Sequence, residues 1–111
     1  MQIQKDIRND RTEFKNLLIH HNVKFLYAFG SSISNGFDTT KSDIDLMVEI
    51  DADDPIERGE KLMQLWDKFE VFFKRKVDLL TDHSIRNPIL RKSIDRTKIL
   101  IYEGEGQKIL V

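Results

Sequence analysis

Two short stretches of this chain decide its fold: FGSS at residues 29–32 and SDIDL at residues 42–46. The first ends an apolar and aromatic run, Val23–Phe29, which predicts a buried strand. The second opens a segment, 43–50, in which every second residue is apolar, as in a strand with one buried face. We therefore expect two strands joined through a Gly-Ser turn, with two aspartates at the start of the second.

The two aspartates, Asp43 and Asp45, are two residues apart, so on a strand their side chains leave the same face. Their Cα atoms would lie about 6.6 Å apart, at roughly 3.3 Å per residue. Carboxylates converging from that distance can share divalent cations, which clamp the attacking and leaving oxygens of a phosphoryl transfer. The alternative is the solvated face of a half-exposed strand, which is the commoner case for the alternation alone.

The Gly30-Ser31 turn favours the metal site over the solvated strand face. Backbone N–H groups at the start of a helical turn attract phosphate oxygens, and glycine lets a phosphate come close to the backbone. The Ser31 hydroxyl adds a donor of little bulk. An ordinary strand-to-helix turn is the alternative for these two residues. Beside Asp43 and Asp45, however, they favour a phosphate cradle next to a metal site.

The remaining pattern predicts an α/β domain. We expect helices over 3–21, 55–74 and 88–95, strands over 77–81 and 98–102, and a mobile tail over 103–111. Asp54-Pro55 and Asn87-Pro88 are typical helix starts, with a capping residue before a proline. The sequence thus predicts a single domain over 1–111 with two layers: a mixed sheet of about four strands, and helices packed on one face.

Composition limits the classes of function. The 18 basic and 19 acidic residues give a net charge of −1, without the basic excess expected of a nucleic-acid-binding protein. The absence of cysteine excludes disulfides and thiolate metal sites. Apolar runs are far shorter than the roughly 20 residues that span a membrane. We therefore expect a cytoplasmic protein that binds neither membranes nor nucleic acid directly.

A third carboxylate, Asp78, lies in the short predicted strand KVDLL at 76–80. Its neighbours Val77 and Leu79 would point to the opposite face. If this strand lies beside 43–50, Asp78 can join the other two aspartates, hold a metal and accept the proton of an attacking hydroxyl. An edge-strand residue facing water is the alternative.

Together these residues resemble the minimal nucleotidyltransferases, small members of the DNA polymerase β-like superfamily. Their signature is Gly-Ser, a spacer, Asp-x-Asp on the following strand and a third carboxylate on a later strand. Gly30-Ser31, Asp43, Asp45 and Asp78 match it. The family often reads Gly-Ser-x-Ala-Arg-Gly, whereas residues 30–36 here read GSSISNG, without the Ala and the Arg.

The resemblance implies an enzyme that binds Mg²⁺ and ATP and moves AMP onto a hydroxyl, releasing pyrophosphate. It implies Asp43, Asp45 and Asp78 as catalytic residues and metal ligands, and Gly30 and Ser31 as phosphate-binding residues. Ser42, directly before the aspartates, is a further candidate for nucleotide binding.

The resemblance also implies a partner. Minimal nucleotidyltransferases often accompany a HEPN-domain ribonuclease toxin, act as its antitoxin and can adenylylate it. Two rival functions stay open at this point. A non-catalytic subunit would neutralise its partner by contact, which the missing Arg favours, and a regulatory domain would only sense nucleotide. The three carboxylates favour the enzyme.

Overall fold

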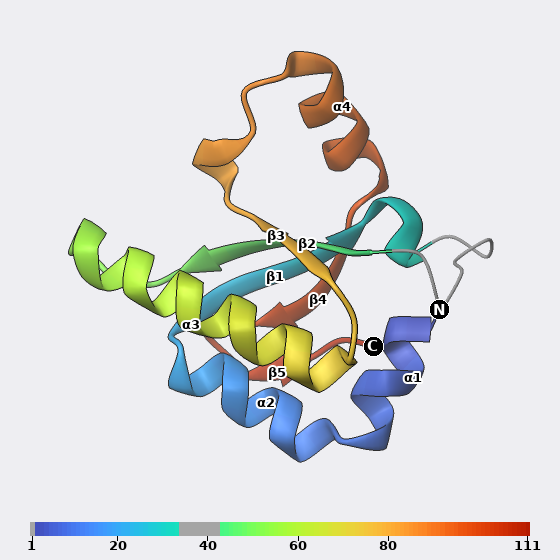
Figure 1. The fold of residues 1–111 in the computed structure, drawn as a ribbon, viewed down its shortest axis with the longest axis vertical. Helices are drawn as coiled ribbons and strands as arrows, with labels where there is room; N and C mark the ends of the chain where they lie inside the picture. The colour runs from blue at the N-terminus through green and yellow to red at the C-terminus, as the bar shows by residue number, and fades with distance from the viewer. Residues whose placement is uncertain (1, 34–42) are drawn as a thin grey trace.

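A five-stranded mixed sheet forms the centre of the computed structural model, which describes residues 2–33 and 43–111 (Figure 1). The strands are β1 (Val23–Phe29), β2 (Ile44–Ile50), β3 (Val77–Leu80), β4 (Ile99–Glu103) and β5 (Lys108–Ile109), in the spatial order β3-β2-β1-β4-β5. Strand β1 runs antiparallel to β2 and β4, β4 runs antiparallel to β5, and β2 and β3 are parallel. The predicted α/β class and mixed sheet are confirmed.

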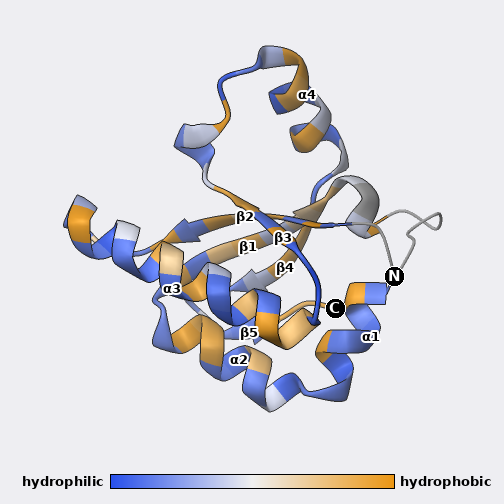
Figure 2. Cartoon of the chain, viewed as in Figure 1, coloured by the Kyte–Doolittle hydropathy of each residue, from blue (hydrophilic) through white to orange (hydrophobic). Residues whose placement is uncertain are grey.

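Three helices cover one face of this sheet: α1 (Gln2–Asn9), α2 (Arg11–His20) and α3 (Pro55–Phe73) (Figure 1). Hydrophobic and hydrophilic residues recur along the length of α2 and α3 (Figure 2), as expected of helices with one apolar side that covers a sheet. Single 3₁₀ turns, η1 (Gly30–Ile33) and η2 (Asp82–Ser84), follow β1 and β3. No helix in the described ranges is both long enough and apolar enough to cross a membrane.

The main core lies between these three helices and the sheet. Phe14 of α2 and Phe69 of α3 are fully buried, and their ring centroids lie 5.9 Å apart. The alternating apolar residues of β2 all point into this core, as their spacing predicts; they are Ile44, Leu46, Val48 and Ile50. The alternation therefore sends the intervening residues of β2 to the opposite face.

The fourth helix, α4 (Pro88–Thr97), lies on that opposite face (Figure 1). Its buried residue Ile94 packs in a separate, smaller cluster with Phe29 and Met47. The expectation of helices on one face therefore holds for α1–α3, and α4 is the exception. Its short apolar contact covers only part of the face.

The helix expected over 3–21 is two helices that meet at Asp10, whose backbone has φ −144° and ψ 57°. Asn9 and Asp10 favour this break, because their side chains compete with the helix for backbone hydrogen bonds. The change of direction brings Ile7 of α1 and Phe14 of α2 into the same core.

The tail expected to be mobile over 103–111 is instead part of the sheet, since β5 pairs with β4 and Ile109 is buried. The Arg11 guanidinium donates hydrogen bonds to the carbonyl oxygens of Ile109 and Val111, each at 3.1 Å. The prediction failed because these contacts come from a residue about a hundred positions away, whereas the two local glycines alone suggested mobility.

Candidate active site

The strand register brings the site together. In β1 and β2, Phe29 and Asp45 are cross-strand partners, and in β2 and β3, Asp45 and Asp78 are. Asp45 therefore lies between the end of β1, where the Gly-Ser turn begins, and Asp78. Neighbouring strands are about 4.8 Å apart, so the two carboxylates have adjacent backbones. The structure confirms the expected position of the third strand.

Asp45 and Asp78 share the face opposite the main core. Their neighbours Ile44 and Val77 are fully buried beneath α1–α3, whereas both aspartates are only partly buried. Because side chains alternate along a strand, both carboxylates belong to the face that carries α4. The direction of these two carboxylates follows from the same alternation that places Ile44 and Val77 in the core.

Gly30 brings the backbone directly against the Asp45 carboxylate. Its φ of +62° lies in the left-handed region, which glycine adopts without steric cost. A Cβ at this position would lie 2.7 Å from Asp45 Oδ2. Both the conformation and the space thus require glycine here, and the turn and the carboxylate form one site.

Ser32 ties the turn to β2, a role that the sequence analysis missed. Its side chain is fully buried, and its Oγ accepts a hydrogen bond from the Asp45 backbone N–H at 2.6 Å. The same Oγ lies 3.3 Å from the Asp45 carbonyl oxygen, to which it donates. A small polar residue directly after Gly-Ser was the only signal in the sequence, and its partner is 13 positions away.

Asp43 lies at the more open end of the site. Its side chain is 40% exposed, and Lys76 Nζ lies 4.0 Å from its Oδ2. The Lys76 carbonyl accepts the Ile44 N–H at 3.0 Å, so the residue before β3 is fixed beside Asp43. An exposed ion pair of this length contributes little to stability.

The other predicted site residues are placed less fully. The Ser31 backbone belongs to η1, directly after Gly30. Ser42 and the rest of the loop 34–42 lie outside the described residues. The assignment of Ser31 and Ser42 to phosphate binding stays a prediction.

The donor set of the site fits a magnesium ion in chemistry. Carboxylate oxygens are the protein ligands that Mg²⁺ prefers, and it commonly takes only one or two, with substrate phosphates and water completing its shell. The aligned pair Asp45 and Asp78 suits that requirement. Over residues 2–33 and 43–111, no three His, Cys, Asp or Glu side chains form a group that could hold an ion. Binding by all three aspartates therefore stays a prediction.

This fold and this strand register define a nucleotidyltransferase domain, and comparison with known proteins agrees. The model of the family described as "Polymerase beta, Nucleotidyltransferase" matches residues 12–107. The chain belongs to this nucleotidyltransferase family, as the Gly-Ser and Asp-x-Asp signature predicted.

Two curated relatives come from Methanocaldococcus jannaschii. "Putative protein adenylyltransferase MJ1379" is 40% identical over 81 residues, covering 73% of this chain and 79% of its own length. "Putative protein adenylyltransferase MJ0126" is 36% identical over 100 residues, covering 90% of this chain and 95% of its own. In both relatives the match spans most of the protein's own length.

Solved structures share the fold. A "putative minimal nucleotidyltransferase" superposes with a TM-score of 0.58 at 23% identity, covering 86% of this chain and 92% of the other. A "toxin-antitoxin with AMP-PNP" also gives 0.58, at 21% identity, covering 88% of this chain and 77% of the matched one. The expected minimal nucleotidyltransferase fold is confirmed.

Proposed function

We propose that this protein is a Mg²⁺-dependent protein adenylyltransferase of the cytoplasm, which transfers AMP from ATP to a hydroxyl group of a partner protein. The observation that carries the proposal is the alignment of Asp45 with Asp78 beside Gly30. It joins a phosphate-binding turn to two carboxylates on an accessible face of the sheet. The names of the two Methanocaldococcus jannaschii relatives support a protein as the acceptor.

The residues divide the reaction between them. Gly30 and Ser31 would hold the phosphates through backbone N–H groups, and Asp43, Asp45 and Asp78 would hold Mg²⁺. Mg²⁺, when bound, neutralises the charge of the phosphates and of the leaving pyrophosphate. Asp78 lies on the edge strand β3, where an acceptor can approach from the open side.

The transfer is an in-line displacement. The acceptor oxygen forms a bond to the α-phosphorus while its proton passes to a carboxylate oxygen of Asp78. The bond between the α-phosphorus and the oxygen bridging to the β-phosphate breaks, and pyrophosphate leaves with that electron pair. Positioning and charge neutralisation supply most of the catalysis in such a reaction.

The partner we propose is a HEPN-type helical ribonuclease toxin, which this protein would neutralise as its antitoxin. The fold shared with a chain of a solved toxin–antitoxin complex containing AMP-PNP supports this partner.

The test uses ATP labelled on either the α- or the γ-phosphorus, the helical protein encoded by the neighbouring gene, and Mg²⁺ or EDTA. We expect α-label, and no γ-label, on the partner, and only with Mg²⁺. An Asp45→Asn variant should give no labelled partner. Partner labelled by the γ-phosphate would reveal a kinase, and neutralisation of the partner by Asp45→Asn without transfer would support the non-catalytic antitoxin instead.

A further inference from the structure

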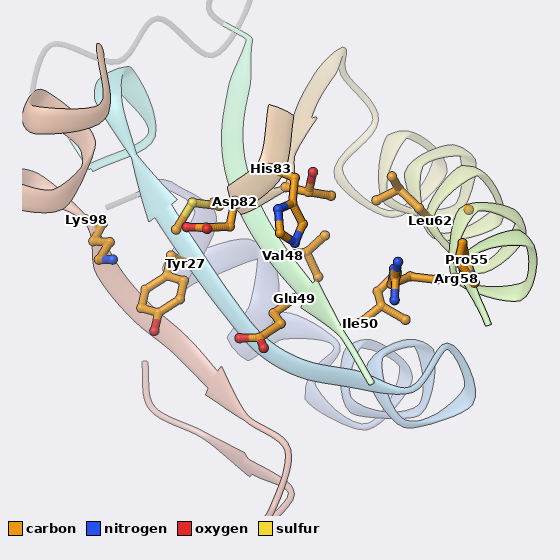
Figure 3. A pocket seen from close by; sticks show the side chains of 13 residues that line it. Tyr27, Val48, Glu49, Ile50, Pro55, Arg58, Leu62, Asp82, His83 and Lys98 are labelled. Carbon is orange, nitrogen blue, oxygen red and sulfur yellow. The ribbon is translucent and has the colours of Figure 1, made fainter. Parts of the chain in front are cut away.

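A cavity of about 630 Å³ lies beside the second half of β2, between α3 and η2, and reaches the face of the sheet that carries Asp45 and Asp78 through Tyr27 and Met47 (Figure 3). Met47, two residues after Asp45 on the same face of β2, forms part of its lining, and so does Thr81, three residues after Asp78. Its far wall is the first half of α3, including Arg58 and Leu62. The lining therefore comes within two residues of Asp45 on β2 and within three residues of Asp78 after β3.

We propose that this cavity binds the nucleoside of the triphosphate, so that the base and ribose occupy it while the phosphates lie on the Gly30 turn. This inference rests on the proposed function and adds the part of the site that recognises the nucleotide. Small-molecule pockets have volumes of about 300–1,000 Å³, and this cavity falls within that range.

The chemistry of the walls suits a flat, uncharged group. Tyr27 and Met47, cross-strand partners in β1 and β2, supply apolar surface on one side, and Leu62 supplies it on the other. The His83 ring points into the space between Tyr27 and Leu62, and Glu49 extends from β2 at the border of that space (Figure 3). Apolar walls with a few polar groups are typical of pockets that orient a ligand through its edges.

The charges of the lining balance, with Arg58 and Lys98 against Glu49 and Asp82, which disfavours the phosphates as occupants. Arg58 Nη1 donates to the Ala52 carbonyl at 2.9 Å, and Lys98 Nζ donates to Asp95 Oδ1 at 3.2 Å. Lys98 also lies 4.7 Å above the Tyr27 ring. The Asp82 carboxylate accepts from Arg91 at 2.6 Å. The cavity thus has no excess of cations for three phosphates, whereas the Gly30 turn offers backbone donors.

The open edge of the sheet at β3 is the side from which an acceptor can approach. Asp78 is on the edge strand, so a hydroxyl of a macromolecule reaches it from outside the sheet. The cavity has walls from β1, β2, η2 and α3, which surround a small group on several sides, whereas the hydroxyl of a folded partner needs only the open edge at Asp78. The nucleoside is the smaller group, so we assign the cavity to it.

Gly59 offers a clean test. It lines the cavity on the same face of α3 as Pro55 and Leu62, and a Cβ at this position would meet no heavy atom within 4 Å. A Gly59→Leu variant would place a side chain in the cavity without straining the helix. Glu60→Leu, one residue further and outside the lining, is the matched control, and Gly59→Ala controls for helix propensity.

The measurement is the Kd of Mg–ATP beside the Kd of Mg–tripolyphosphate, which has the phosphates but no nucleoside. For Gly59→Leu we expect ATP to bind at least about tenfold more weakly, an effect of about 1.4 kcal/mol, and tripolyphosphate to bind as in the wild type. Both control variants should keep both affinities.

Each other outcome is decisive. Unchanged ATP affinity with slower transfer to the partner would make the cavity an acceptor site and overturn the proposal. Unchanged affinity and unchanged transfer would overturn it as well. Asp45→Asn separates the two levels of inference: if it leaves both affinities unchanged, the proposed catalytic site itself is wrong, whatever Gly59→Leu does.

Discussion

The two faces of the sheet are built from the same strands and have opposite properties. Beneath α1–α3, β2 presents Leu46 and Val48 to an apolar core. On the other face, β2 presents Asp45 beside Met47, and α4 covers only part of the surface through Ile94. Alternation along one strand thus separates stability from chemistry, so substitutions on one face should alter folding and those on the other should alter catalysis.

The strongest test of this separation is Asp78→Asn. The change keeps size and shape but removes the charge and the basic oxygen, so we expect the transfer rate to fall by roughly 10²–10⁴. Mg–ATP should still bind, because Asp45 and the Gly30 turn remain, and the free energy of unfolding should stay near that of the wild type. Transfer rate, nucleotide affinity and urea unfolding are measured together. Transfer at the wild-type rate would make Asp78 a surface residue.

On the opposite face, Phe69→Ala should act only on folding. The ring is fully buried and lies 5.9 Å from Phe14, and truncating a buried phenylalanine costs about 3–5 kcal/mol. Urea unfolding measures the loss. Below the unfolding transition the Kd of Mg–ATP should be unchanged; a weakened Kd would show that the two faces are coupled.

Ser32→Ala tests the connection between the faces. It leaves the Asp45 backbone N–H without the Ser32 Oγ that accepts it at 2.6 Å, and an unsatisfied buried donor costs about 1–3 kcal/mol. Transfer should also slow, because the bond fixes Asp45 relative to the turn. Ser32→Cys, which keeps a weaker acceptor, should fall between the wild type and Ser32→Ala in both measurements. If stability falls but kcat and KM do not change, Ser32 is a purely structural residue.

Gly30→Ala should lower the free energy of unfolding somewhat less than Ser32→Ala does. A left-handed backbone costs a residue with a Cβ about 1–2 kcal/mol, and here the Cβ would also meet Asp45 Oδ2. We expect Mg–ATP and Mg–tripolyphosphate to bind more weakly to the same extent, because the turn holds phosphates. Gly106→Ala in the β4–β5 turn is the control. A selective loss of ATP affinity would contradict this assignment of the turn.

The smallest effect should come from His21, a buried residue that directly follows α2. Burial lowers the pKa of its imidazole below the usual 6.5, and the hydrogen bond to the Leu17 carbonyl opposes this only in part. The unfolded chain then binds the proton more tightly, so this contribution to stability is complete above pH 6.5 and is lost as the pH falls through the folded pKa. Urea unfolding at pH 7.5 and 5.5 should show the loss, reduced in His21→Gln and retained in His20→Gln.

Much of this arrangement could be predicted from local patterns. Period-two alternation over 43–50 identified the buried face of β2, and Asp54-Pro55 and Asn87-Pro88 marked the starts of α3 and α4. These predictions succeeded because each depends on neighbouring residues, whose side-chain directions follow from strand and helix geometry.

Contacts between distant segments could not be read in this way. The Ser32 hydroxyl accepts a hydrogen bond from the Asp45 amide, and Arg11 donates one to the Ile109 carbonyl. Gly59 of α3 lines the same cavity as Tyr27 of β1. The periodicity of apolar residues does not predict such contacts, because they depend on how the helices pack on the twisted sheet. The strands, their faces and the carboxylates follow from residue order, whereas the shape of the cavity and the anchoring of the turn exist only once the layers have packed.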